Sequence, residues 1–249
     1  MAGESMAGVG KDQEDSFRRR TGITAQDFDL LGRIPLFAGL RRERVEALLK
    51  DAWAQHFPRN TVLFLEGEPA PRFYIVTEGW VKLLRQSADG QESVVAVFTR
   101  GDSFAEAAIL ESGVYPVSAV VATKARLIVV PAGSFLAQLR EDSDVALNML
   151  ASMSRHLRHL VIQLQQRTIE SSTQRVADFL LRLCPVRAGP AVIHLPVDKA
   201  LIAARLGMQP ETLSRTLAKF RDFGVATKGD EIAISDAAVL RELREPPAG

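Results

Sequence analysis

The segment that decides the fold is Leu201-Ile202-Ala203-Ala204-Arg205-Leu206-Gly207-Met208-Gln209-Pro210-Glu211-Thr212-Leu213-Ser214-Arg215. It predicts a helix, a tight turn and a second helix. Gly207 lies where such a turn needs a positive φ, and Ala203 is small where two crossing helices touch. Pro210 suits the first turn of the second helix, where a backbone N–H has no helical partner. The apolar residues have helical spacing and predict one shared core: Ile202, Leu206, Leu213 and Leu217. This arrangement is typical of a helix-turn-helix whose second helix enters the major groove of DNA.

The polar residues of the second helix are the candidate DNA contacts, because the same spacing directs them away from the core. The whole chain has a formal net charge of +1, so attraction to phosphates has to come from a local surface. Residues 205–228 hold five basic and two acidic residues, a local excess of three positive charges. The predicted DNA-binding residues are Gln209, Glu211, Thr212, Ser214, Arg215 and Lys219.

Composition places the chain among ordinary globular proteins, with 47% hydrophobic and 24% charged residues. Its 249 residues can form two domains with separate cores. The single cysteine, Cys184, excludes an intrachain disulfide and a cysteine-ligated iron–sulfur cluster, and we expect it to be buried near a helix end. No segment approaches the roughly 20 apolar residues of a membrane span, and no apolar signal core begins the chain. We therefore expect a cytoplasmic protein with no membrane partner.

Residues 56–131 consist of short β-rich runs separated by glycine-containing turns. The runs are 61–64, 73–76, 80–84, 94–98 and 127–130, and Asp89-Gly90 predicts a hairpin. This pattern predicts a small barrel or sandwich. We expect residues 1–27 to be a flexible tail, because they are rich in Gly, Ser and charge, and residues 28–141 to form the sensing domain.

A long helix is predicted for residues 142–167. Its apolar residues recur in alternating steps of three and four, the period of a coiled-coil seam between two copies: Leu150, Met153, Leu157, Leu160 and Leu164. The alternative is a stripe that packs on its own domain. Residues 142–170 are thus the predicted dimerisation helix and hinge.

Residues 171–249 form the predicted DNA-binding domain. A helix over 172–183 is expected to be capped by Ser172 or Thr173. Short strands at 225–227 and 231–234 predict a wing, to which 192–195 adds a strand, and Asp236 can cap a last short helix.

The order of these parts resembles the Crp–Fnr family of bacterial transcription regulators. The resemblance implies an α+β fold with an N-terminal cyclic-nucleotide-binding-like β-roll (jelly roll), a long dimerisation helix and a C-terminal winged helix-turn-helix. It assigns the reading of a TTGAT-like palindrome to Glu211, Ser214 and Arg215. The chemistry agrees, since Arg can bind guanine O6 and N7 and Glu can accept from a base amino group. The implied partners are double-stranded DNA, a second copy in a homodimer, RNA polymerase, and a small-molecule or gas effector.

The effector motif departs from the family's cyclic-nucleotide members. Those carry Gly-Glu in a turn and Arg-Ser shortly after it, and the Arg holds the cyclic phosphate. This chain has Ala105-Glu106 and Val117-Ser118. A phosphate beside Val117 would lack a charged partner, so the sequence argues against cyclic AMP. The matching positions make Phe104, Glu106, Val117 and Ser118 the candidate effector-binding residues.

Five short segments are most similar to the DNR and NnrR branches of the family: 66–70, 79–83, 104–107, 115–118 and 209–212. Those branches regulate denitrification in response to nitric oxide, with haem as the suspected sensor. The resemblance therefore implies haem b and a role in anaerobic nitrogen-oxide metabolism. The four histidines are His56, His156, His159 and His194, and no motif assigns any of them as the haem or metal ligand.

Three alternatives belong to other classes. One is a cyclic-nucleotide-binding regulatory module of a kinase or channel, a second is a Crp-type regulator of another small molecule, and a third is a winged helix used for protein contacts. An enzyme is not expected, because the chain has no Gly-rich phosphate loop, paired His/Cys nucleophile or metal-spaced cluster.

Overall fold

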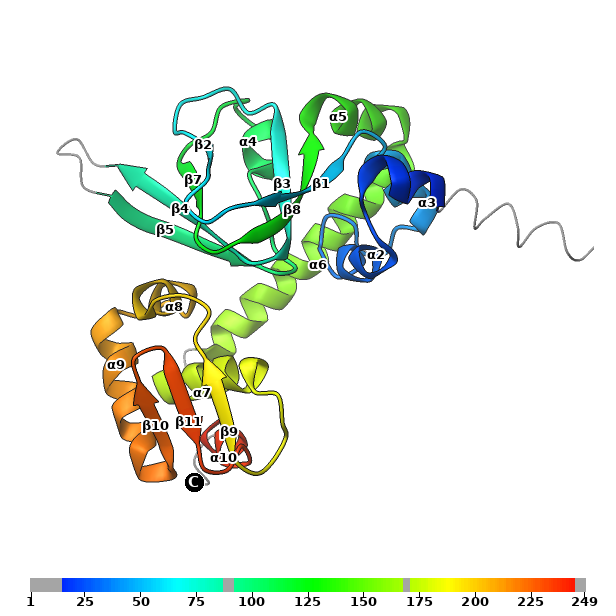
Figure 1. Cartoon of the computed structure of the whole chain (residues 1–249). Coiled ribbons are helices and arrows are strands. Elements are labelled where there is room, and N and C mark those ends of the chain that lie inside the picture. The colour runs from blue at the N-terminus through cyan, green and yellow to red at the C-terminus, as the bar shows by residue number, and fades with distance from the viewer. Residues whose placement is uncertain (1–14, 87–91, 168–170, 245–249) are drawn as a thin grey trace, which may run out of the picture. The chain divides into compact units, whose positions relative to one another are not determined.

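The chain forms two compact units, each with its own apolar core, in the computed structural model (Figure 1). The structure describes residues 15–86, 92–167 and 171–244, and it describes only the backbone of residues 156 and 159–167. Most of the chain up to His159 belongs to the first unit, and the chain from Leu160 onward belongs to the second. The predicted Asp89-Gly90 turn lies outside the described residues.

The first unit contains two four-stranded sheets, which confirms the predicted β-roll. One sheet has the order β1 (Trp53–Phe57), β8 (Ala125–Pro131), β3 (Arg72–Glu78) and β6 (Ser103–Phe104). The other has the order β2 (Val62–Phe64), β7 (Ser118–Val121), β4 (Trp80–Gln86) and β5 (Glu92–Thr99). The interior strand β3 is buried from Phe73 to Thr77. That burial explains why its sequence is a continuous apolar run, whereas the edge strand β5 is largely exposed.

Gly79, between β3 and β4, is a position where only glycine fits. Its φ is +82°, and a Cβ there would overlap the backbone of Lys124 and Ala125. The close approach of the β3–β4 turn to the start of β8 therefore depends on the missing side chain.

Two helices of the first unit were not predicted. They are α4 (Glu106–Leu110) and α5 (Ala132–Glu141), the second of which ends one residue before the long helix α6 (Ser143–Arg167). Asp142 separates α5 from α6, because its backbone is extended and its carboxylate accepts a 3.1 Å hydrogen bond from the Val145 backbone N–H. Such N-terminal capping starts a new helix. The predicted long helix is confirmed to within one residue.

The N-terminal region differs from the expected tail. Residues 15–21 are helical, and Phe17 and Ile23 are buried in the core of the first unit. Helices α2 (Ala25–Leu31) and α3 (Arg42–Leu48) follow. The prediction of a flexible tail up to residue 27 is thus wrong from residue 15, because two apolar side chains and a buried carboxylate hold this segment. The preceding residues lie outside the described part of the chain.

That carboxylate belongs to Asp27, which anchors α2 to strand β8. Arg126 donates to both Asp27 oxygens at 2.8 and 3.0 Å, and also to the Gly22 carbonyl at 2.7 Å. Thr24 and Asp27 form a reciprocal capping box. Burial disfavours the ionised carboxylate, but the hydrogen bonds from Arg126 and Thr24 outweigh it and lower the pKa of Asp27 below its ordinary value.

The second unit begins with α7 (Ser172–Leu183). Its cap is Ser171, whose hydroxyl accepts from the Gln174 backbone N–H, and not Ser172 or Thr173 as expected. Val176 and Leu180 are buried, and Cys184, at the end of α7, is half-buried. The remaining elements are β9 (Ala191–His194), α8 (Lys199–Arg205), α9 (Pro210–Lys219), β10 (Val225–Lys228), β11 (Glu231–Ile234) and α10 (Val239–Arg244).

The predicted wing is confirmed. Strands β10 and β11 form an antiparallel hairpin, and β9 adds a third strand in the order β10-β11-β9. Asp236 accepts hydrogen bonds from the backbone N–H groups of Gly189 and Ala238, which joins the β9 side of the sheet to the start of α10. These bonds lower the pKa of Asp236 below its ordinary value.

The buried ion pair gives a first prediction. Asp27→Asn leaves the Arg126 guanidinium without its counter-charge, so we expect the first unit to lose about 3 kcal/mol of unfolding free energy at pH 7. Trp53 and Trp80 are the only tryptophans and both belong to the first unit, so urea unfolding followed by tryptophan fluorescence reports on it. The matched control is Asp29→Asn, on the exposed side of the same helix.

The pH dependence has a defined sign. A carboxyl whose folded pKa is depressed stabilises the fold at pH above its unfolded value and ceases to do so as pH falls through the folded value. The difference between wild type and Asp27→Asn should therefore be full at pH 7 and shrink below the ordinary value of 3.8. A difference that is constant from pH 7 to pH 2.5 would contradict the ionic role.

Candidate functional site

Helices α8 and α9 form the predicted helix-turn-helix. Asp198 caps α8 by accepting a 2.9 Å hydrogen bond from the Leu201 backbone N–H. Ala203 is fully buried where the helices meet, and Gly207 has a φ of +62° in the turn. The Met208 N–H donates to the Ala203 carbonyl at 3.0 Å and closes the turn. The small residue and the glycine therefore have the structural roles that their spacing predicts.

Helix α9 has one buried and one exposed face. Leu213, Thr216 and Leu217 are buried, and the Thr216 hydroxyl donates to the Thr212 carbonyl at 2.8 Å and to the Ser172 hydroxyl at 3.2 Å. The second bond ties α9 to the start of α7. Because the inner face is held in this way, rotation of α9 about its axis is restricted, and the outer side chains have fixed directions.

The outer face of α9 carries the predicted DNA contacts. Thr212 is half-buried, and the other predicted contacts are exposed: Gln209, Glu211, Ser214, Arg215 and Lys219. Within the described part of the chain, none of these side chains forms a hydrogen bond or ion pair. A face of unpaired hydrogen-bonding groups on an otherwise packed helix is the arrangement that base reading requires.

Helix α6 has apolar residues on two faces. Val145, Met149 and Ser152 are buried on the face that packs within the first unit. The other face is an apolar stripe of Leu147, Leu150, Met153 and Leu157, whose side chains are 63%, 62%, 42% and 63% exposed. The alternative of a stripe packed on its own domain is wrong for Leu150, Met153 and Leu157. The predicted seam residues Leu160 and Leu164 have side chains outside the described part.

The candidate effector residues lie where the two sheets of the β-roll face one another. Phe104 of β6 and Val117, just before β7, are buried. Glu106 begins α4 and accepts a 2.8 Å hydrogen bond from the Ser103 hydroxyl. Ser118 accepts a 2.9 Å hydrogen bond from the Glu66 backbone N–H. The polar groups at these positions thus have partners within the protein.

An aromatic cluster that the sequence reading missed connects the two sheets. Phe64 of β2 stacks on Tyr115 with ring centroids 3.7 Å apart, and Tyr74 of β3 stacks on Phe104 at 5.2 Å. Phe98 is 5.3 Å from Phe104 and completes the cluster. Burial is the main cause that raises the pKa of both tyrosines, so they remain neutral at physiological pH. Phe104 therefore lies in a buried aromatic cluster, and the charged residues that act on its tyrosines are Arg72 and Glu68.

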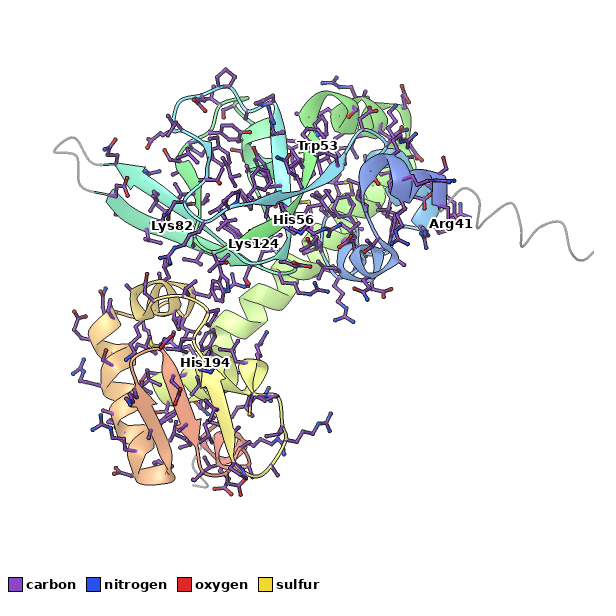
Figure 2. The ribbon with its side chains drawn as sticks, in the orientation of Figure 1. Arg41, Trp53, His56, Lys82, Lys124 and His194 are labelled. Atoms are coloured by element: carbon purple, nitrogen blue, oxygen red, sulfur yellow. The ribbon has the colours of Figure 1, made fainter. Side chains whose placement is uncertain are left out.

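The two histidines with described side chains do not fit a haem group. His56 lies on β1 and His194 on β9, and both are exposed on edge strands (Figure 2). Neither position offers the apolar enclosure that a porphyrin needs. The described residues also contain no group of three or more His, Cys, Asp or Glu side chains that could hold a metal. The side chains of His156 and His159 lie outside the described part.

Two family models match this architecture. The cyclic nucleotide-binding domain matches residues 54–142, and the Crp-like helix-turn-helix domain matches residues 174–243. The chain is 31% identical to the cyclic AMP receptor protein of Thermus thermophilus over 84% of this chain and 96% of that relative.

The chain belongs to the Crp–Fnr family. It is a DNA-binding transcription regulator with an N-terminal effector domain, and neither matched family is catalytic. The β-roll and winged helix-turn-helix that the sequence predicts are those of the Crp–Fnr fold. Within the described residues, no helix is both long and apolar enough to cross a bilayer.

Two solved structures refine the comparison. A protein from Ruegeria pomeroyi, provisionally named as a cyclic nucleotide binding protein, is 40% identical and covers 88% of this chain and 96% of its own, with a TM-score of 0.76. DNR from Pseudomonas aeruginosa is 29% identical and covers 87% of this chain and 97% of its own, with a TM-score of 0.54. Both share the fold across most of this chain.

The backbone at Ala105 gives a second prediction. Ala105 has a φ of +69° at the position where cyclic-nucleotide members carry glycine. An L-residue pays about 1 kcal/mol for this left-handed conformation, so Ala105→Gly should raise the unfolding free energy of the first unit by about that amount. Tryptophan fluorescence during urea unfolding measures it. Ala107→Gly, at the second residue of α4, should instead lower stability by about 0.5–1 kcal/mol.

Proposed function

We propose that this chain is a homodimeric, effector-responsive Crp–Fnr regulator that reads a TTGAT-like palindrome, with RNA polymerase as its partner in transcription. The observation that carries the proposal is the unpaired polar face of α9, with Glu211, Ser214 and Arg215 exposed. Arg215 would bind a guanine through two parallel hydrogen bonds, and Glu211 would accept from a base amino group. Thr212 and Lys219 would contact phosphates and set the position of the helix.

The apolar stripe of α6 supports the dimer. Four large apolar side chains on one helix face would remain in water in a single copy. Their spacing fits the seam of a two-stranded coiled coil, and a second copy of the same helix would cover them. Two-fold symmetry would then place two α9 helices on half-sites about 10 base pairs apart.

A third prediction concerns base reading. Arg215→Ala should weaken binding to a TTGAT palindrome by about 1–3 kcal/mol and relax the preference at the guanine. Fluorescence anisotropy with palindromes that vary at that base, at one fixed salt concentration, measures both effects. The control is Arg241→Ala on α10, an exposed arginine outside α9. Unchanged sequence preference in Arg215→Ala would overturn the assignment.

A fourth prediction concerns assembly. The double variant Leu150→Glu/Leu157→Glu puts charges into the seam, so sedimentation should show a monomer where the wild type is a dimer. The monomer should keep the fold of the first unit, because both residues are exposed in a single copy. Leu110→Glu, which also replaces an exposed leucine in the first unit, should leave the dimer intact. If the double variant still sediments as a dimer, the interface lies elsewhere.

For the effector, we propose nitric oxide sensed through haem, on the resemblance to the DNR and NnrR branches. The similarity to DNR over 87% of this chain supports a sensor of that kind. A histidine ligand would have to come from outside the described side chains, where His156 and His159 lie. By linkage, the effector activates only if it binds the DNA-competent state more tightly than the other state.

A cyclic nucleotide is the second candidate effector, because one relative is named a cyclic AMP receptor protein and a cyclic nucleotide-binding domain model matches residues 54–142. Val117 argues against it, since it puts a buried apolar side chain at the position of the phosphate-binding arginine.

The fifth prediction separates these effectors. Haem-reconstituted protein should show stoichiometric haem, a shift of its Soret band with nitric oxide, and a change in palindrome affinity. Calorimetry should detect no binding of cyclic AMP to the wild type. If cyclic AMP binds and raises DNA affinity while haem does not bind, the nitric oxide proposal fails and the DNA-reading proposal stands.

A further inference from the structure

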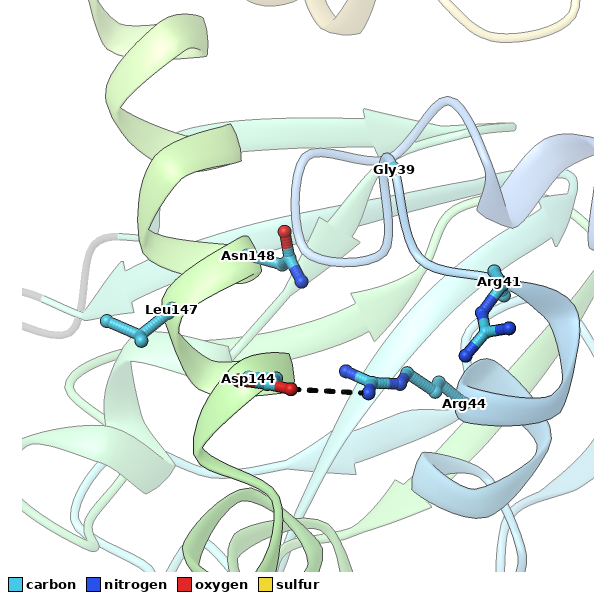
Figure 3. A pocket seen from close by; sticks show the side chains of 6 residues that line it. All are labelled: Gly39, Arg41, Arg44, Asp144, Leu147 and Asn148. Atoms are coloured by element: carbon cyan, nitrogen blue, oxygen red, sulfur yellow. Dashed lines mark ion pairs between the residues drawn. The ribbon is translucent and has the colours of Figure 1, made fainter.

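A cavity of about 420 Å³ lies in the first unit between the start of α3 and the first turns of α6. Arg41 and Arg44 line it from the α3 side, and Asp144 and Asn148 line it from α6 (Figure 3). Leu147 and the backbone of Gly39 complete its wall. None of these residues belongs to the aromatic cluster or to the candidate effector positions, so the cavity is a separate feature of the sensing unit.

The acidic partners of Arg44 hold it loosely. Its guanidinium is 3.5 Å from the Asp142 carboxylate and 3.5 Å from the Asp144 carboxylate. Figure 3 shows the second of these ion pairs, between Arg44 and Asp144. Both distances exceed the 2.7–2.9 Å of a close charged hydrogen bond. The Asp144 side chain is 73% exposed, so its attraction to Arg44 is strongly screened by water. An incoming oxyanion could therefore replace Asp144 at little cost.

Two further arginines add positive charge at the same place. Arg41 is the first residue before α3 and is exposed, and its guanidinium forms no hydrogen bond or ion pair among the described residues. The Arg155 guanidinium reaches to 4.0 Å from the point where a Cβ would lie on Gly39. Arg41 and Arg44 thus line the cavity with one carboxylate, that of Asp144, and Arg155 lies beside Gly39. This excess of positive charge favours an added anion.

We propose that this cavity binds a small organic anion whose carboxylate or phosphate group lies between Arg41 and Arg44. A planar guanidinium matches the paired oxygens of either group. The Asn148 amide would donate a further hydrogen bond, and Leu147 would contact the apolar part of the ligand. The volume falls within the range of small-molecule sites and suits a short dicarboxylate or a small phosphate ester.

Leu147 also belongs to the apolar stripe of α6, which gives the site a regulatory consequence. This part of the inference rests on the proposed dimer. A ligand that holds Leu147 and Asn148 against α3 would orient the first turns of α6 and so favour one arrangement of the seam.

The test uses the full chain and calorimetric titration with glutarate and, separately, inorganic phosphate at fixed ionic strength set with chloride. Wild type should bind at least one probe saturably, with a preference that identifies the carboxylate or the phosphate class. Arg41→Gln should weaken binding at least tenfold. Asp144→Asn should tighten it several-fold, because the competing carboxylate is gone. Both side chains are exposed, so neither variant should unfold the unit.

Matched controls keep the outcomes distinct. Arg33→Gln and Asp51→Asn change exposed residues of the same unit that do not line the cavity, and both should bind as wild type does. Equal weakening in Arg41→Gln and Arg33→Gln, or no saturable binding of either probe, overturns the site.

Binding that persists in the Leu150→Glu/Leu157→Glu variant supports the site independently of the dimer. Loss of binding in that variant alone would instead place the anion at the interface between copies and overturn the single-chain site. Unchanged dimer affinity in the presence of a saturating probe would overturn the regulatory consequence alone.

Discussion

Helix α6 has to bury apolar surface on two faces, and the rest of the molecule depends on that constraint. Val145 and Met149 are buried within the first unit, where they belong to its hydrophobic core. Leu147, Leu150 and Leu157 are exposed, and no part of the described chain covers them. At about 25 cal/mol per Å² of apolar surface, these three side chains and Met153 represent several kcal/mol that burial would recover. The same helix continues into the second unit.

Burial of one helix face also determines the proposed DNA-reading surface on α9. Burial of Leu213 and Leu217 fixes which side of α9 faces inward, and the Thr216 hydroxyl adds a polar contact to α7. The outer residues then need no internal partners and remain available for bases. Core packing in the second unit therefore sets the direction of the outer side chains for which base reading is proposed.

In the sensing unit, the backbone of the turn at Ala105 matches the family's effector turn although the residues differ. Ala105 keeps the left-handed backbone of the turn at about 1 kcal/mol of strain, so the turn is retained although glycine is not. Ser118 is retained but accepts a hydrogen bond from the Glu66 backbone N–H, and Val117 is buried. Positive charge is found instead at the cavity beside α3 and α6. In this chain, the arginines that line the cavity are thus separate from the candidate effector positions.

The sequence by itself determined the elements whose signals are local. Periodicity, Gly207 and Pro210 were sufficient for the helix-turn-helix, and the apolar runs of the interior strands were sufficient for the β-roll. Local signals failed where partners are distant in the chain. Residues 15–27 resemble a tail in composition, yet Asp27 pairs with Arg126 about a hundred residues later, and Phe17 joins the core. The aromatic cluster and the cavity around Arg41, Arg44 and Asn148 likewise come from segments far apart in sequence. Only the tertiary structure decided these features, because long-range burial and charge pairing leave no periodic pattern in the residues that they join.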